Sequence, residues 1–345
     1  MTTIHLPHEA ETPQRLYTCW PATAEYWPAP LDQVWPEYAA FLKALLQPGP
    51  SGERLALTVY ASTAEAEASA RQALGARAEI LRRPYGDVWT RDTGPVFLRQ
   101  GRSLQAVRFT HNGWGGKYLY PGDTTIGQVI ADHAGADVIA GDLVAEGGAF
   151  EFDGEGTLLT TRQCLLNANR NPGLSEAQVE ARLKAAFGVE KVLWIDEGMV
   201  ADHTDGHIDN IVRFARPGVV VCQAPFGADD AQARVFADIR RQLERMRDAR
   251  GRKLQVHAIP GPGRVYDDEG ELMPASYLNW VHGAGSVIVP VYGTASESRA
   301  LELLRRLFPG RRVAGSPARA ILSGGGAFHC VTCHVPGERA CSEPV

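Results

Sequence analysis

Apolar residues recur at helical spacing in several segments of the chain. Residues 175–187 show the pattern most clearly: a capping box opens the segment, three apolar residues lie on one face, and Gly188 follows the last of them. The same signals predict four more helices, over residues 62–74, 123–133, 229–250 and 294–307. The five predicted starts, at 62, 123, 175, 229 and 294, lie 52 to 65 residues apart. This near-regular spacing indicates an internal repeat.

Short runs rich in β-branched and aromatic residues lie between these helices. They cover residues 55–60, 157–161, 192–195, 211–214, 219–222 and 287–291. One helix and about three strands per period predict five copies of a β/α unit in an α/β fold. A doubly wound α/β fold with accidental spacing is the alternative. Residues 31–47 add an amphipathic helix outside the period. No linker divides the chain, so we expect residues 1–345 to form a single catalytic domain.

Composition narrows the classes of function. The chain has 345 residues, 44% of them apolar, and can therefore bury a large core. No run approaches the roughly 20 apolar residues of a membrane span, and residues 1–9 lack a secretory pattern. We therefore expect a cytoplasmic protein without a membrane partner. The net charge of -5, without a basic cluster, argues against nucleic acid as a partner and is compatible with a cationic ligand.

The cysteines leave three interpretations of one C-terminal segment. Six cysteines are scattered along the chain, which argues against a disulfide framework; they are residues 19, 164, 222, 330, 333 and 341. Cys330 and Cys333, followed by His334, match the pattern of covalent haem attachment, and with His329 they offer a local metal-ligand set. Haem attachment of this type normally requires export, and no second C-x-x-C completes a zinc ribbon. The third interpretation is that Cys330 is a nucleophile.

The surroundings of Cys330 favour the nucleophile. Three glycines, residues 324–326, precede it and allow close backbone approach after an expected strand over residues 320–322. A thiol forms a thiolate near neutral pH only beside a positive group, such as a protonated histidine or a bound cation. Histidines and carboxylates elsewhere in the chain are therefore candidates to share a site with this residue.

His207 and Asp209 are the first such pair. If a strand begins near Gly206, their i, i+2 spacing places both side chains on one face while Ile208 points into the core. The pair would then combine an acid/base group with an anion. The alternative is a hydrogen-bonded structural pair. His203 and His207 also have H-x-x-x-H spacing, but Gly206 argues against the helix that a zinc site of that type needs.

Carboxylates with aromatic neighbours form a second group of candidates. Asp92, expected at a strand edge near Trp89, could hold a planar cation with in-plane hydrogen bonds and an aromatic surface. Trp114 could supply an aromatic wall on a loop, and Glu146 a buried carboxylate. The alternatives are a surface Asp92 paired with Arg91 and ordinary turns. A thiol, a histidine and several carboxylates suit a guanidinium better than acyl transfer, which needs donors for an oxyanion.

Eight motifs, which run in order from about residue 84 to Pro336, resemble those of agmatine deiminases and the related bacterial peptidyl-arginine deiminases. They are Trp89–Pro95, Asn112–Gly116, Glu146–Gly148, Asp153–Thr161, Cys164–Pro172, Asp205–Asn210, Ser276–Asn279 and Gly324–Cys330. The resemblance implies a five-fold pseudosymmetric α/β propeller of ββαβ-type repeats around a central channel that holds the active site.

The resemblance also implies a mechanism and its residues. Cys330 would attack the guanidinium carbon, and His207 would act as general acid and base. Asp92 and Asp209 would bind the guanidinium nitrogens, and Glu146 would orient the histidine. Substrate contacts are expected from Trp89, Trp114, Asn279 and Gly326. The implied reaction converts agmatine and water to N-carbamoylputrescine and ammonia through an S-amidino intermediate. No metal or organic cofactor is expected. The resemblance also suggests a homodimer.

The chain departs from the typical pattern outside the expected catalytic set. Ala327 follows the glycines where these enzymes carry Asn, Cys333 and His334 replace a pair of Gln, and Val107-Arg108 replaces an Asp-Trp. These changes leave free arginine, peptidyl-arginine or another guanidino compound as alternative substrates. A metal- or haem-binding redox protein that uses Cys330 and Cys333 is the distant alternative.

Overall fold

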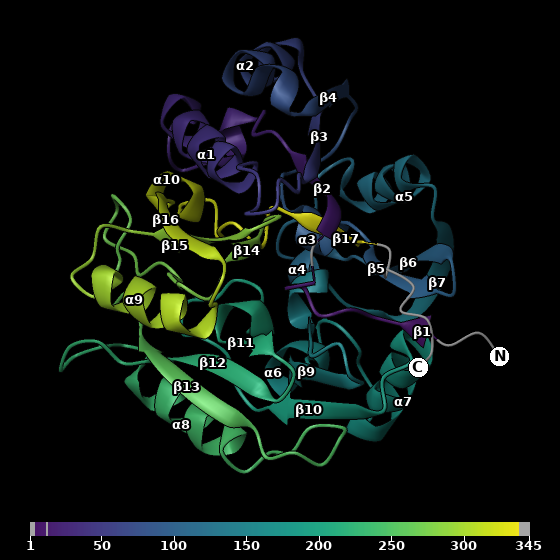
Figure 1. The fold of residues 1–345 in the computed structure, drawn as a ribbon, viewed down its shortest axis with the longest axis vertical. Coiled ribbons are helices and arrows are strands. Elements are labelled where there is room, and N and C mark those ends of the chain that lie inside the picture. The colour runs from purple at the N-terminus through teal and green to yellow at the C-terminus, as the bar shows by residue number, and fades with distance from the viewer. Residues whose placement is uncertain (1–3, 12, 338–345) are drawn as a thin grey trace.

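Five separate β-sheets form the framework of the protein in the computed structural model, which describes residues 4–11 and 13–337 (Figure 1). Cys341 lies outside the described residues. Three sheets have three strands each: β8 (Glu151–Phe152), β9 (Thr157–Thr161) and β10 (Lys191–Ile195); β11 (Val212–Arg216), β12 (Val219–Ala224) and β13 (Gln255–Pro260); and β14 (Val281–His282), β15 (Ser286–Val291) and β16 (Arg312–Pro317). The other two have the orders β1 (Ile4–His5), β5 (Val96–Gln100), β6 (Ser103–Thr110), β7 (Asp137–Val144), and β17 (Cys333–Pro336), β2 (Pro13–Cys19), β3 (Ala56–Ala61), β4 (Glu79–Arg82).

The same connection recurs in every sheet. One strand pairs antiparallel with one neighbour and parallel with the other, as β9 does with β8 and β10. A parallel pair needs a crossover, and a helix provides it in each case. These helices are α1 (Leu31–Leu45) between β2 and β3, α5 (Asp123–Ala134) between β6 and β7, α7 (Glu176–Phe187) between β9 and β10, α8 (Ala233–Leu243) between β12 and β13, and α9 (Glu297–Leu307) between β15 and β16. The five ββαβ units fit the predicted five-fold pseudosymmetric α/β propeller.

One predicted helix belongs to a different place in the repeat. The helix over residues 31–47, expected outside the period, is α1, the crossover of the fifth unit. The helix at residues 62–74 is α2 (Ala64–Leu74), which leads to the extra edge strand β4. The spacing along the sequence did not indicate these places of α1 and α2, because the fifth unit combines the two ends of the chain. In this unit β17 pairs antiparallel with β2, with Cys333 opposite Tyr17.

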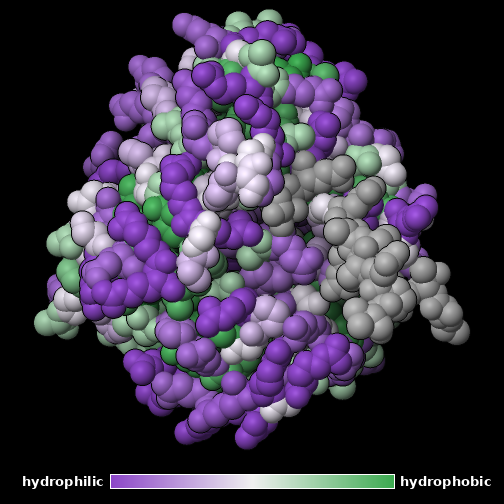
Figure 2. All heavy atoms as spheres, in the orientation of Figure 1, coloured by the Kyte–Doolittle hydropathy of each residue, from purple (hydrophilic) through white to green (hydrophobic). Residues whose placement is uncertain are grey.

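The crossover helices lie around the outside of the molecule, and the short helices α3 (Thr90–Thr93) and α4 (Gly113–Gly116) lie near its middle (Figure 1). Helix α7 has the predicted capping box and buries the three predicted residues Val179, Leu183 and Phe187. Hydrophilic residues cover most of the face shown in Figure 2. Within residues 4–11 and 13–337, no helix is long and apolar enough to cross a membrane.

The predicted strand over residues 320–322 is wrong, because this segment is the short helix α10 (Arg319–Leu322). Its main-chain N–H groups at Ala320 and Ile321 donate to the carboxylate of Glu37 on α1, at 2.8 and 3.2 Å. Long-range capping of a helix start therefore overrides the β-type composition. The helix ends just before the three glycines, so Cys330 lies in the turn between α10 and β17.

Candidate active site

Cys330 is buried, and an amide holds its sulfur. The side-chain Nδ2 of Asn279 lies 3.2 Å from Cys330 Sγ and donates to it, while Asn279 Oδ1 accepts from the main-chain N–H groups of His329 and Cys330 at 2.9 and 3.3 Å. Asp209 Oδ2 lies 3.8 Å from the same sulfur. Asn279, predicted to contact the substrate, therefore contacts the thiol and fixes the turn that carries it.

His207 is fully buried and lies between two carboxylates. Its Nε2 is 3.4 Å from Glu146 Oε2, and its Nδ1 is 3.8 Å from Asp92 Oδ1. The predicted strand at this point is wrong: residues Ile208–Asn210 form a 3-10 turn, η4, and β11 begins only at Val212. Gly206, with φ of +89°, provides the reversal that leads into the turn. His207 and Asp209 thus reach the site from a tight turn, while Ile208 packs into the core as expected.

Gly148 shows how closely these groups converge. It lies in the 3-10 turn η3 (Gly147–Ala149) directly after Glu146. A Cβ atom added at Gly148 would lie 2.5 Å from His207 Nδ1, 2.9 Å from Asp92 Oδ1 and 3.2 Å from Asp209 Oδ2. Three predicted site residues therefore surround one point, which only a residue without a side chain can occupy.

Asp92 lies in helix α3 rather than at the predicted strand edge. Its Oδ1 accepts from the main-chain N–H of Gly148, and its Oδ2 accepts from Trp114 Nε1, both at 2.9 Å. It is buried, so the alternative of a surface Asp92 paired with Arg91 is wrong; Arg91 pairs with Glu9 at 3.0 Å. Trp114 adopts φ of +52° in α4, which turns its indole N–H toward this carboxylate. The tryptophan thus fixes the orientation of the acid.

A pocket of about 170 Å³ opens onto Cys330 and Asp92. Trp89, Trp114 and three tyrosines form its aromatic walls, and Asp87 adds a second carboxylate. Gly326 lies at its base, where an added Cβ would be 2.7 Å from Trp89 and 3.2 Å from Cys330 Sγ. No lysine or arginine is among the described residues that line the pocket. This lining suits a slender cation with an apolar stem.

The protonation states of the site depend on burial and on the carboxylates. Burial, together with Asp209 and Asp92, raises the pKa of the Cys330 thiol well above its usual value. Burial opposes the charged form of His207, but Asp92 and then Cys164 and Glu146 raise its pKa well above the usual value. Without a bound cation the site therefore holds a neutral thiol and an imidazolium.

Glu146 and Asp209 are kept ionised by neighbouring Arg170 and His329, whose roles the sequence did not indicate. Burial would raise the pKa of Glu146, but His207 and Arg170 lower it; Arg170 Nε donates to the two carboxylate oxygens at 2.8 and 3.1 Å. Burial would likewise raise the pKa of Asp209, but His329 lowers it across a contact of 2.7 Å. Arg170 and His329 both lie within motifs noted above, yet only their contacts identify these roles.

Two further residues near the site were also missed from sequence. Asp87 lines the pocket and accepts from Trp89 Nε1 at 2.9 Å. Cys164 places its thiol 3.9 Å from Glu146 Oε2, beside His207. Asp87 stands two residues before Trp89 and could have been marked as a fourth acid. Nothing in the sequence indicates that Cys164 faces the histidine.

The metal-binding alternative gains no support from the donor geometry. Cys330 Sγ faces the pocket, whereas Cys333 Sγ points away to the carbonyl oxygen of Pro95 at 3.3 Å. Glu9, His329 and His334 do form a group with metal-ligand spacing, but Arg91 and Arg213 both donate to Glu9, and Arg91 also donates to His334 Nδ1. The Glu9 carboxylate and His334 Nδ1, two of the donor groups that a metal ion would need, thus already accept from arginines. A second group, Glu146, Cys164 and His207, has its carboxylate occupied by Arg170.

Comparison with known proteins identifies the family. The Porphyromonas-type peptidyl-arginine deiminase family matches residues 5–336. The chain belongs to this family. An agmatine deiminase of Ectopseudomonas mendocina is 32% identical over 360 residues, which cover 97% of this chain and 96% of that protein. A Legionella pneumophila protein that bears the same name provisionally is 34% identical over 340 residues, covering 96% of this chain and 95% of that protein.

A solved structure extends this similarity to three dimensions. Agmatine deiminase of Enterococcus faecalis has a TM-score of 0.89 and 30% identity, covering 96% of each chain. The similarity therefore includes all five ββαβ units and the turn that carries Cys330.

We predict that Gly148→Ala lowers kcat/KM by about 100-fold or more, because its methyl group would displace His207, Asp92 or Asp209 by a large fraction of an ångström. Steady-state kinetics on a guanidino substrate measure this effect, with circular dichroism to verify folding. Gly135→Ala is the control: a Cβ there would meet nothing within 4 Å, and the backbone strain of alanine at φ of +67° would lower the stability of the fold without touching the site. Unchanged activity of a folded Gly148→Ala protein would contradict the described geometry.

Proposed function

We propose that this protein is an agmatine deiminase, a hydrolase that converts agmatine and water to N-carbamoylputrescine and ammonia. The observation that carries the proposal is a buried histidine and pair of aspartates that surround one point. The buried thiol of Cys330 lies 3.8 Å from one of these aspartates and, with the other, lines an acidic, aromatic pocket. The names of full-length relatives support the same activity.

Binding of the guanidinium is the first proposed step. Asp209 Oδ1 and His207 Nδ1 are buried and make no hydrogen bond to the described residues. Asp92 and Asp209 can each accept from a planar guanidinium placed between them, which leaves its central carbon near Cys330. The bound cation offsets the carboxylate charges that raise the pKa of the thiol, so substrate binding favours the thiolate.

In the chemical steps that follow, His207 first gives up a proton and then takes one back. The Cys330 thiolate attacks the guanidinium carbon and forms a C–S bond, and the imidazolium of His207 gives its proton to the departing nitrogen, which leaves as ammonia. The neutral histidine next takes a proton from water as its oxygen attacks the S-amidino carbon. The tetrahedral intermediate then loses its hydroxyl proton to solvent, and its collapse breaks the C–S bond, restores the thiolate and releases the ureido product. Glu146, held by Arg170, stabilises the histidine in its charged form.

Agmatine fits the pocket better than arginine. Agmatine ends in an ammonium, whereas free or C-terminal arginine also presents a carboxylate. Asp87 can pair with the ammonium, and no lysine or arginine among the described lining residues can pair with a carboxylate. Peptidyl-arginine stays the second candidate because the family description names it.

Three further assignments accompany this proposal, on domain organisation, localisation and oligomeric state. We propose that residues 1–345 act as one catalytic domain, which the pairing of β17 with β2 supports by joining the chain ends. We propose a cytoplasmic protein, which the five free cysteines among the described residues support. A homodimer stays a prediction.

A substrate panel tests the function directly. We expect ammonia and a ureido product from agmatine, at a kcat/KM at least about tenfold above that for arginine or a peptide with C-terminal arginine, since these place a carboxylate among acids. Mass detection of the ureido product measures it. Cys330→Ala should abolish turnover, whereas Cys333→Ala should retain it because its thiol faces Pro95. Turnover of arginine above that of agmatine would reassign the substrate.

Asp87 should make the KM for agmatine depend on pH. Burial, opposed by hydrogen bonds from Val88 and Trp89, raises the pKa of Asp87 to about 7. Only the ionised form attracts an ammonium, so KM for agmatine should rise as pH falls through about 7. Asp87→Asn should raise KM about tenfold or more at pH 8 and remove most of this dependence. An alkylguanidine without the ammonium serves as the control substrate, and an equal loss on it would contradict the assignment.

A further inference from the structure

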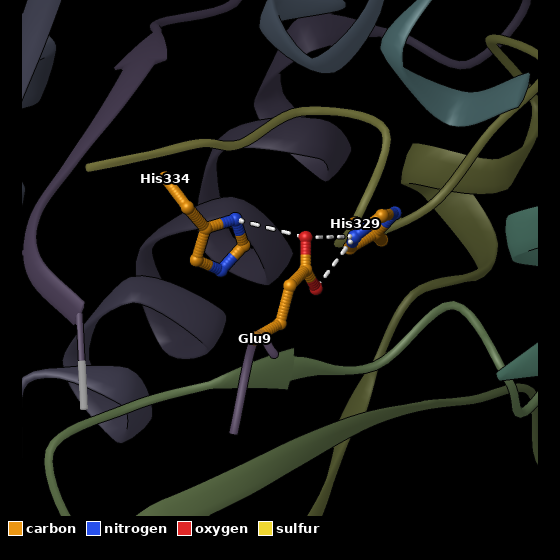
Figure 3. A group of neighbouring side chains, drawn as sticks. All are labelled: Glu9, His329 and His334. Atoms are coloured by element: carbon orange, nitrogen blue, oxygen red, sulfur yellow. Dashed lines mark hydrogen bonds and ion pairs between the residues drawn. The ribbon is translucent and has the colours of Figure 1, made fainter. Parts of the chain in front are cut away.

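His329, the residue before Cys330, lies between two carboxylates behind the candidate active site. Its Nδ1 is 2.7 Å from Asp209 Oδ2, and its Nε2 is 2.9 and 3.0 Å from the two carboxylate oxygens of Glu9. The ring is fully buried, so water does not share these contacts. Figure 3 shows Glu9 between His329 and His334, with contacts to both.

The two contacts define what the ring of His329 must carry. An ionised carboxylate accepts hydrogen bonds and has none to donate. Both Nδ1 and Nε2 therefore have to donate, which requires an imidazolium. A neutral ring would turn one lone pair toward a carboxylate at under 3 Å.

The neighbours of Glu9 keep it ionised. Arg91 Nη1 lies 3.0 Å and Arg213 Nη2 lies 2.6 Å from its oxygens. Burial would raise the pKa of Glu9, but Arg91, His329 and other cations hold it well below its usual value. Arg213 itself is buried and also pairs with Glu151 at 2.8 Å.

His334 differs from His329 although it contacts the same carboxylate. Arg91 Nη2 donates to His334 Nδ1, so that nitrogen accepts and the ring is neutral. Burial also lowers the pKa of His334 well below its usual value. Neither of its contacts reaches Asp209. The two histidines thus form a matched pair in which only one connects Glu9 to the site.

We propose that His329 is a doubly protonated positioning residue that fixes the carboxylate of Asp209 for guanidinium binding, with Glu9 as the second carboxylate to which its ring donates. The same residue fixes the nucleophile, because its main-chain N–H donates to Asn279, whose amide contacts Cys330 Sγ. Both the acid and the turn that carries the thiol are therefore held by contacts to one residue. The positioning role rests on the proposed function, whereas the charge of His329 does not.

Nuclear magnetic resonance of ¹⁵N-labelled histidine rings tests the charge in the intact protein. The signals of His329 are assigned by their loss in His329→Asn. In the wild type near neutral pH we expect both ring nitrogens to carry protons. Glu9→Gln, which keeps the shape and removes the charge, should convert His329 to a neutral ring, while His334→Gln should leave its signals unchanged. A neutral His329 in the wild type overturns the proposal even if no variant folds.

Kinetics on agmatine test the positioning role. Glu9→Gln should lower kcat/KM by about tenfold or more, because Asp209 loses its fixed partner. His334→Gln should change it less than about twofold, since Gln can still accept from Arg91. A folded Glu9→Gln protein with a neutral His329 and full activity would overturn the role. Failure of the wild type to turn over agmatine would instead overturn the proposed function, and the positioning role with it.

Discussion

The candidate active site depends on the compensation of buried negative charge. Asp92, Asp209, Glu146 and Glu9 lie within a short distance of one another and are largely removed from water. Isolated carboxylates in such a place would take up protons or destabilise the fold. Each instead has a counter-charge or directed donors: Arg170 on Glu146, His329 on Asp209, arginines on Glu9, and Trp114 with Gly148 on Asp92. In the proposed mechanism, one planar cation binds between the two aspartates.

The fold supplies these groups from distant parts of the chain. Asp92 comes from α3, Glu146 from the turn before β8, His207 and Asp209 from the turn before β11, and Cys330 from the turn before β17. Each lies just before or after a strand of a different ββαβ unit, so the repeat brings equivalent turns toward one centre (Figure 1). Pairing of β17 with β2 places the nucleophile from the end of the chain beside the first strands. The outer helices bury apolar faces and contribute no predicted site residue.

Sequence patterns predicted the units and the principal site residues but misjudged local geometry. Hydrophobic period and capping signals found α7, α5 and the strands because those signals are local. The strand expected at residues 320–322 failed because Glu37, almost 300 positions away, caps that segment as a helix. His207 and Asp209 were paired correctly but for the wrong reason, since a 3-10 turn brings them together. Arg170, His329 and Glu9 were missed because charge compensation depends on contacts between motifs, which no single motif displays.

The central step of the proposed mechanism is the bond that Cys330 forms to the carbon of a bound guanidinium. Acid quenching during steady-state turnover of agmatine, followed by mass analysis of the peptide that contains Cys330, measures this directly. We predict an adduct with the mass of agmatine less ammonia on Cys330, absent from Cys330→Ala and from enzyme quenched before substrate is added. Turnover with no adduct on Cys330 across quench times, or an adduct on Cys333 or Cys164 instead, would contradict it.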